Sequence, residues 1–255
     1  MTWWHAVIFG IVEGLTEFLP ISSTGHLILT AKLLGLPQTE FMKSFEICIQ
    51  LGAILAVLLI YGRTLLVKPE ISKRVLVALL PTLAAGFLLY KTVRNLLADP
   101  TVILWSLFLG GLVLIAFDHW HRERPDAIEG TENIPYSKSF WIGVAQSVAM
   151  VPGVSRAGAT IVGGLALGLQ RKTIVEFSFL LAVPTLLAAT TLDLYKNGAS
   201  FNGADWTLLL IGAAVSCAVA FGVIRFFIRY VQNRGFFVFG VYRILAALLF
   251  WTVLK

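Results

Sequence analysis

Long apolar stretches follow one another along almost the whole chain. Six have roughly the 17 to 25 apolar residues that a helix needs to cross a bilayer. Two more are interrupted near their middle by proline or glycine, so that each half is too short to span. The six stretches cover 45–61, 75–94, 101–118, 174–194, 206–228 and 236–254, and the two broken segments cover 3–36 and 139–169. This pattern predicts an all-α integral membrane protein with six transmembrane helices and two re-entrant broken helix pairs.

The order of these elements repeats, because a broken segment followed by three spans occurs twice. The pairs at an offset of 132 are Pro20 and Pro152, Ser23 and Ser155, and Phe45 and Phe177, and those at an offset of 133 are Gly10 and Gly143, and Glu13 and Gln146. An odd number of spans per copy forces the second copy to lie upside down relative to the first. We therefore expect one membrane domain over 1–255, made of two inverted repeats, 1–118 and 139–255, joined by a cytoplasmic loop over 119–138.

Composition supports a membrane protein and assigns its sides. Hydrophobic residues make up 58% of the chain and charged residues 13%, whereas soluble domains carry about 25% charged residues. The net charge of +6 does not indicate nucleic acid, because the basic residues lie mostly in short loops beside apolar stretches. These loops, around 62–74, 119–138, 171–172 and 225–234, are predicted to be cytoplasmic. The first broken segment then enters from the outside, and the second enters from the cytoplasm.

Two carboxylates stand out in the first broken segment, which reads GIVEGLTEFLPISSTGHL over 10–27. Glu13 and Glu17 are four residues apart, so on a helix they share one face and repel each other. A cation or a basic partner between them would relieve this repulsion. We therefore expect a metal or a basic group beside this pair.

Hydroxyl groups and an imidazole follow the acidic pair. Pro20 should end the helix, and three hydroxyl residues at 22–24 are then candidates to cap a new one, whose first N–H groups have no helical acceptor. His26, in the first turn, can move a proton near neutral pH. Carboxylates, hydroxyls, an imidazole and a helix N-terminus together favour a phosphate site. The hydroxyl candidates are Ser22, Ser23 and Thr24.

The second broken segment, VPGVSRAGAT over 151–160, brings an arginine to membrane depth. Pro152 and Gly153 end one half-helix, and Ser155 can cap the next. An unpaired Arg156 would be costly in the bilayer, and its planar fork suits phosphate or carboxylate oxygens. The alternative is a salt bridge to one of the two glutamates, with no substrate involved.

Several further residues are weaker candidates for substrate contact. Gln50 lies in a predicted span and could equally bond to a neighbouring backbone, and Ser155 could serve only as a cap. Arg243 is a charge inside the last predicted span, which suggests either function or structural pairing. The complete set of substrate-binding candidates is Thr24, Gly25, Gln50, Ser155, Thr160 and Arg243.

Three motifs resemble a known family: EGLTEFLPISSTGH at 13–26, FEICIQLGAILAV at 45–57 and PGVSRAGAT at 152–160. They are similar to the signatures of the bacterial undecaprenyl-diphosphate phosphatases, also called bacitracin-resistance phosphatases. The resemblance covers essentially the whole chain, including FFVFGVYR at 236–243, and departs only slightly at Ala157, where the family often has serine. It implies hydrolysis of undecaprenyl diphosphate to undecaprenyl phosphate and inorganic phosphate at the outer face of the plasma membrane. This reaction would recycle the lipid carrier of peptidoglycan synthesis and confer bacitracin resistance.

The resemblance also implies a divalent cation, Mg²⁺ or Ca²⁺. Glu13 and Glu17 are expected to hold it, so that it bridges diphosphate oxygens. Arg156 would clamp the diphosphate and stabilise charge in the transition state. Ser23 is the first choice for a nucleophile, and His26 would act as general base or acid.

Other mechanisms and another class of function stay open. His26 could be the nucleophile itself, Glu17 could activate a water, and Ser22 or Thr24 could support Ser23. Inverted repeats with broken helices are also typical of transporters, so a lipid-phosphate flippase or secondary transporter is the alternative function. The expected partners are a polyprenyl diphosphate lipid and membrane lipids. The sequence leaves the oligomeric state, including a homodimer, undecided.

Overall fold

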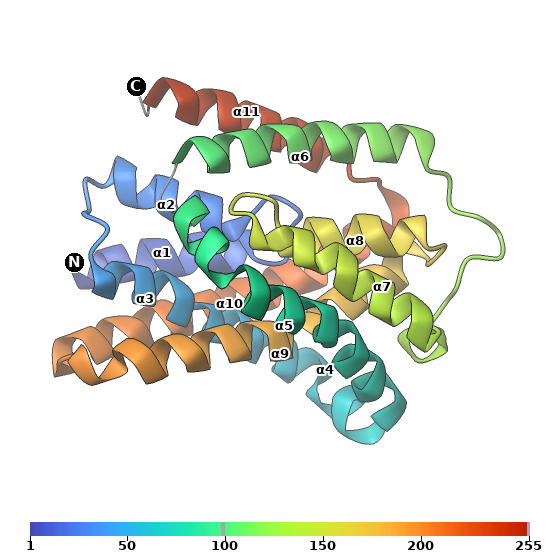
Figure 1. Ribbon diagram of the computed structural model, residues 1–255, viewed down its shortest axis with the longest axis horizontal. Helices are drawn as coiled ribbons and strands as arrows, with labels where there is room; N and C mark the ends of the chain where they lie inside the picture. Colours follow the sequence, from blue (N-terminus) through green and yellow to red (C-terminus); the bar gives the residue numbers. More distant parts are fainter. Residues whose placement is uncertain (98–99, 254–255) are drawn as a thin grey trace.

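The computed structural model describes residues 1–97 and 100–253, and these residues are almost entirely helical (Figure 1). An isolated β-bridge also joins Ile128 and Leu169. The first half contains α1 (Trp3–Thr16), α2 (Ser23–Leu33), α3 (Glu40–Cys48), α4 (Gln50–Val67), α5 (Pro69–Leu97) and α6 (Pro100–Trp120). The second contains α7 (Tyr136–Ser147), α8 (Arg156–Ala166), α9 (Arg171–Asn197), α10 (Gly203–Asn233) and α11 (Phe237–Val253), with short 3-10 turns at Thr131–Asn133, Val148–Met150 and Gly198–Ser200.

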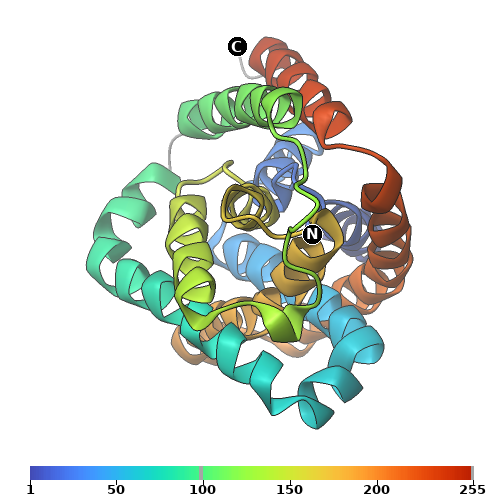
Figure 2. The ribbon, with the colours of Figure 1, turned by 90° about the vertical axis from the view of Figure 1, so that its right-hand side faces the viewer.

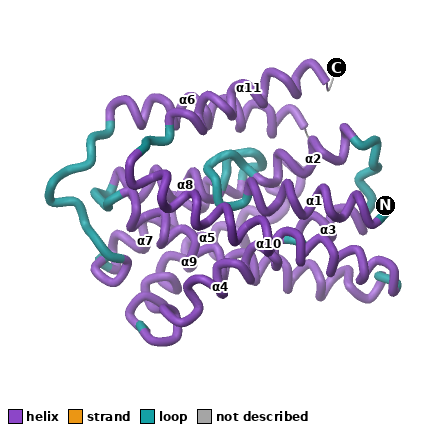
Figure 3. Tube along the Cα trace, turned by 180° about the vertical axis from the view of Figure 1, so that it is seen from behind, coloured by secondary structure: helices purple, strands orange, loops and turns teal. Residues whose placement is uncertain are grey.

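Both predicted helix breaks are confirmed. α1 ends at Thr16 and α2 begins at Ser23, so Pro20 lies in the turn between them. α7 and α8 are separated in the same way, with Pro152 in the intervening turn. The two turns lie beside each other in the middle of the molecule, as opposite views show (Figures 1 and 3).

Five helical stretches are long and apolar enough to cross a membrane: Glu40–Val67, Pro69–Leu89, Pro100–Trp120, Arg171–Ser200 and Gly203–Asn233. The sixth expected span, 236–254, corresponds to α11, a shorter apolar helix of 17 residues, and its residue 254 lies outside the described residues. Large apolar side chains point away from the protein on several of these helices. Examples are Leu66 at 87%, Phe87 at 86% and Leu88 at 78% exposure. Such a surface suits lipid rather than water, and the protein is an all-α integral membrane protein.

One expected span differs from the prediction, because the stretch over 45–61 is divided at Ile49 into α3 and α4. Neither proline nor glycine stands at this position. Instead the Gly52 N–H bonds to the Ile49 carbonyl at 3.0 Å, an i to i+3 contact that tightens the chain locally. A Cβ at Gly52 would collide with the Ala213 backbone, so the division lies beside a close approach of α4 to α10.

Close helix packing positions the two broken segments. A Cβ on Gly10 would lie 2.6 Å from the Gly212 carbonyl oxygen, so glycine lets α1 lie directly against α10. Gly143 does the same for α7 and α5, where a Cβ would run into the Ala78 carbonyl. Seen end-on, α8 lies near the middle of the molecule with other helices around it (Figure 2). The broken segments are therefore held inside the bundle.

Candidate active site

Each turn ends in a serine with strained backbone. Ser22 has φ 72° and Ser155 has φ 77°, and among the described residues other than glycine these two alone have positive φ. Such conformations cost about 1 to 3 kcal/mol each and cluster at functional sites. Both side chains cap the following helix, Ser22 by a long bond of 3.5 Å from the Gly25 N–H and Ser155 by one of 3.1 Å from Gly158. The sequence pairing of Ser23 with Ser155 was therefore wrong by one residue, because the cap of the second turn corresponds to Ser22.

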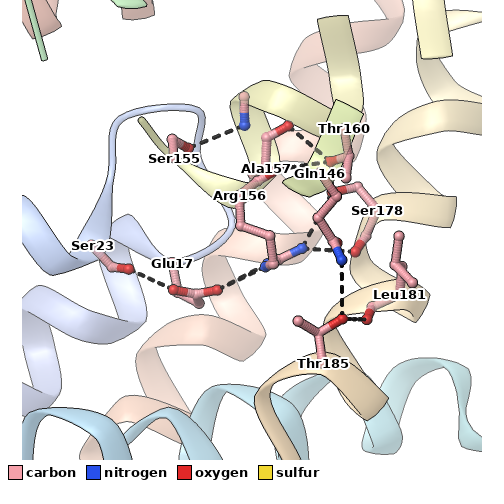
Figure 4. A network of polar contacts seen from close by, with 11 residues as sticks. Glu17, Ser23, Gln146, Ser155, Arg156, Ala157, Thr160, Ser178, Leu181 and Thr185 are labelled. Carbon is pink, nitrogen blue, oxygen red and sulfur yellow. Dashed lines mark hydrogen bonds and ion pairs between the residues drawn. The ribbon is translucent and has the colours of Figure 1, made fainter. Parts of the chain in front are cut away.

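The turns bring an acid, an arginine and a hydroxyl together (Figure 4). One Glu17 carboxylate oxygen, Oε1, accepts from Arg156 Nη2 at 2.9 Å and from Nε at 3.2 Å. The other oxygen, Oε2, accepts from the Ser23 hydroxyl at 2.5 Å. The side chains of Arg156 and Glu17 are only 10% and 5% exposed. Glu17 of the first broken segment and Arg156 of the second are thus paired, as in the salt bridge that the sequence left open as the alternative to a substrate contact.

A second set of contacts fixes the other edge of the guanidinium. Arg156 Nη1 donates to the Ser178 carbonyl at 2.9 Å and to its hydroxyl oxygen at 3.4 Å. The Thr160 and Ser178 hydroxyls are 2.6 Å apart, and Thr160 itself donates to the Arg156 and Ala157 carbonyls. Thr160 therefore orients Arg156 through Ser178. Ser178 was not among the residues predicted for the site, since a serine inside an apolar span carries no distinctive signal.

Glu13 has an unusual environment for a carboxylate. It is 0% exposed, and neither of its oxygens has a hydrogen-bond partner within the described residues. Glu17, Arg156 and Glu46 are near enough to act on it electrostatically. A buried charge without a partner is very costly, so an ionised Glu13 would need a cation beside it.

Glu13 and Glu17 are the carboxylates of this site that could hold Mg²⁺ or Ca²⁺. No group of three or more His, Cys, Asp and Glu side chains that could hold a metal occurs in the part of the chain that the structure describes. Glu13 and Glu17 would thus supply carboxylate oxygens, and the remaining ligands would be waters and phosphate oxygens. Mg²⁺ is commonly held in this way, by one or two carboxylates plus substrate phosphates.

His26 lies apart from the Ser23–Glu17 contact. Its Nδ1 is 2.7 Å from the Ser22 carbonyl oxygen, and its Nε2 is 2.8 Å from the Tyr242 hydroxyl. A carbonyl only accepts, so Nδ1 carries a proton, and in neutral imidazole Nε2 accepts from Tyr242. Both ring nitrogens are thus engaged away from Ser23. Tyr242 was not singled out from the sequence, although it lies in the FFVFGVYR motif.

Arg243 is buried, and its five N–H donors all meet backbone carbonyls. These belong to Pro20, Ser106, Leu107, Gly153 and Val154, at 2.8 to 3.2 Å. The predicted substrate contact would require the guanidinium to release one of them, so the structure favours the structural alternative.

The remaining candidates lie near the site with fewer contacts. Gln50 is half-buried at the start of α4, and no described hydrogen bond joins it to the network. Thr24 is half-buried in the first turn of α2. Gly25 is buried, and a Cβ there would lie 3.3 Å from Ile103. The structure therefore brings Glu17, Ser23 and Arg156 into direct contact but not these three.

Comparison with known proteins identifies the family of the chain. Residues 6–249 match the family described as "Bacitracin resistance protein BacA". A protein of Sulfurihydrogenibium sp. named undecaprenyl-diphosphatase is 51% identical over 98% of this chain and 99% of its own length. Proteins with the same name from Aquifex aeolicus and Bdellovibrio bacteriovorus are 50% and 44% identical, over 98% and 100% of this chain and 98% and 97% of their own. The chain belongs to the bacitracin resistance protein family.

Proposed function

We propose that this protein hydrolyses undecaprenyl diphosphate to undecaprenyl phosphate and inorganic phosphate. The observation that carries the proposal is the contact in which Glu17 accepts from both Ser23 and Arg156. It joins a nucleophile, a base and a cationic clamp in one buried place. The name shared by relatives that match over nearly their full length supplies the substrate.

This contact supports a mechanism in which Ser23 is the nucleophile. The Ser23 oxygen attacks the terminal phosphorus while Glu17, which already accepts its hydrogen bond, takes the proton. The bond from that phosphorus to the bridging oxygen breaks, and undecaprenyl phosphate leaves. Water then hydrolyses the phosphoserine and releases phosphate. Arg156, turning from Glu17 toward the diphosphate, stabilises the charge that develops on the leaving oxygens.

Other parts of the two turns bind the diphosphate. The first N–H groups of α2 and α8 have no acceptor inside their own helices and are suited to phosphate oxygens. Mg²⁺ or Ca²⁺ held by Glu13 and Glu17 would neutralise phosphate charge when bound. Placing Glu17 as the base replaces the role expected of His26, whose ring nitrogens contact Ser22 and Tyr242 instead.

We further propose six membrane spans arranged as two inverted repeats, with the site reached from the outer face of the plasma membrane. Support comes from residues 133 positions apart that have the same structural role. Ser22 and Ser155 both cap a helix at positive φ, and Gly10 and Gly143 both allow the backbone of a neighbouring helix to approach closely. The concentration of basic residues in the opposite loops supports the orientation.

Phosphate release from purified protein in detergent tests the function. The wild-type protein should release phosphate from undecaprenyl diphosphate without any membrane compartment, whereas a flippase or transporter would not. Ser23→Ala should remove nearly all turnover, and Ser200→Ala, at an exposed serine, should not. Nearly full activity in Ser23→Ala would overturn the serine mechanism and leave a water activated by Glu17.

A further inference from the structure

One arginine links the two turns at the centre of the protein. Arg243 Nη1 donates to the Pro20 carbonyl of the first turn at 3.1 Å and to the Val154 carbonyl of the second at 2.8 Å, and Nη2 donates to Gly153 at 2.9 Å. Its remaining donors hold the Ser106 and Leu107 carbonyls of α6. Since every N–H is used, the guanidinium has the geometry of an internal brace.

The positions of these carbonyls show that the brace is central to both halves. Pro20 and Gly153 are 133 residues apart, the same offset that relates the capping serines Ser22 and Ser155. Arg243 thus holds equivalent carbonyls in the two turns. The residue 133 positions before Arg243 is Gly110, and a Cβ there would collide with the guanidinium. The interface between α6 and α11 therefore has room for a single arginine, supplied by the second half.

The residue before it on α11 supports the first turn by another route. The Tyr242 hydroxyl is 2.8 Å from His26 Nε2, and the two rings stack with an interplanar angle of 10°. His26 Nδ1 in turn donates to the carbonyl of Ser22, the strained residue before the proposed nucleophile. Tyr242 and Arg243 therefore fix the backbone on both sides of Ile21.

We propose that Tyr242 and Arg243 are positioning residues for phosphoryl transfer, acting as a clamp that keeps Ser23 and Glu17 of one turn aligned with Arg156 of the other. This inference rests on the proposed function. It assigns Arg243 to alignment of the site rather than to the substrate, and it assigns His26 to the support of Ser22 rather than to proton transfer with Ser23.

Conservative substitutions test the clamp. Arg243→Lys keeps the charge, but a single ammonium cannot replace a fork that reaches both turns and α6, and Tyr242→Phe removes only the hydroxyl. Both should lower kcat about 10- to 100-fold, the effect of a small misalignment, with KM changed less than ~3-fold. The control is Arg225→Lys, at an exposed arginine that stacks on Phe221, which should keep wild-type kinetics. Rates are expressed per mole of monodisperse protein, so that a loss of folded protein does not appear as a loss of kcat.

A spectroscopic measurement on apo protein separates alignment from general stability. With ¹⁵N-labelled histidine, the chain gives signals from four imidazoles, and His26 is identified by a His26→Gln variant. Its nitrogen shifts should change in Tyr242→Phe and in Arg243→Lys but not in Arg225→Lys. Unchanged kcat together with an unchanged His26 signal would overturn the clamp. A raised KM with normal kcat would also overturn it, because Arg243 would then contact substrate.

Two outcomes keep this test distinct from that of the function. If the wild-type protein released no phosphate while the His26 signal still moved in both variants, the proposed function would fail, and Tyr242 and Arg243 would be shown to link the turns without a role in phosphoryl transfer. If Arg243→Lys did not fold, Gly110→Ala would displace the guanidinium without removing it. It should lower kcat as Tyr242→Phe does, whereas Gly222→Ala, with open space around its Cβ, should not. Normal kcat in both Gly110→Ala and Tyr242→Phe would overturn the clamp.

Discussion

Replacing Glu17 with glutamine removes a charge and a base while nearly keeping the shape of the side chain. The amide oxygen can still accept from Arg156, as Oε1 does now at 2.9 and 3.2 Å. The amide nitrogen, however, cannot accept the Ser23 hydroxyl that Oε2 holds at 2.5 Å. Glu17→Gln therefore tests whether this carboxylate takes the proton from Ser23.

The size of the effect follows from these contacts. A positioned general base contributes about 10²- to 10⁴-fold to the rate, which corresponds to about 3 to 5 kcal/mol of barrier. The folding cost should be smaller. Removing one member of a buried ion pair costs about 3 to 5 kcal/mol when the other is left alone, but Arg156 keeps the glutamine oxygen and the Ser178 carbonyl. We expect about 1 to 3 kcal/mol of lost stability.

The assay is phosphate release at saturating undecaprenyl diphosphate, with thermal unfolding of the same preparation. Glu40→Gln is the control, because Glu40 pairs with Lys43 at a surface where the side chains are 73% and 54% exposed. It should leave kcat unchanged. If kcat of Glu17→Gln stayed within about tenfold of wild type, the loss of rate would be smaller than that expected for a general base, and Glu17 would be refuted as the base.

Three further results are expected. Glu13→Gln removes a buried carboxylate without hydrogen-bond partners, so the unfolding temperature of the apo protein should stay unchanged or rise. Phosphate release at low cation concentration should fall at least about tenfold. If the unfolding temperature fell together with phosphate release, the result would count against a cation at Glu13. Chelation of divalent cations should stop phosphate release, and added Mg²⁺ or Ca²⁺ should restore it; full activity under chelation would exclude the metal. Gly143→Ala should destabilise the protein by about 1 to 3 kcal/mol because its Cβ meets the Ala78 carbonyl, whereas Gly62→Ala, at an open position, should not; equal unfolding temperatures would contradict this packing.

Hydropathy and helix-breaking residues were sufficient for the coarse architecture. Apolar length gives the spans, and prolines without an N–H give the breaks at Pro20 and Pro152. The division at Ile49 could not be predicted in this way, because it accompanies close approach to α10 at Gly52. Tertiary packing, rather than local sequence, determines that feature.

The candidate site was predictable where charge at membrane depth forces a partner. Arg156 needed an anion, and Glu17 was one of two acids that the repeat could bring to it. Hydroxyl and ring contacts were harder, because Ser178 and Tyr242 are chosen by three-dimensional proximity and both occur in apolar helices. For Arg243, substrate contact and structural pairing were equally compatible with the sequence, and only the carbonyls of two distant turns distinguish them.

The link between the turns also bears on the choice between a hydrolase and a carrier. A carrier that exposes its site alternately to each face has to move one broken segment relative to the other. Here that movement would take Arg243 from carbonyls of both turns, leaving guanidinium donors unpaired at membrane depth. Each such buried charge costs several kcal/mol. The equivalent position in the first half is Gly110, so no second arginine could donate to the carbonyls that Arg243 had released. A hydrolase that binds lipid from one face needs only local rotation of Arg156, so the link that Arg243 makes between the turns favours catalysis over transport.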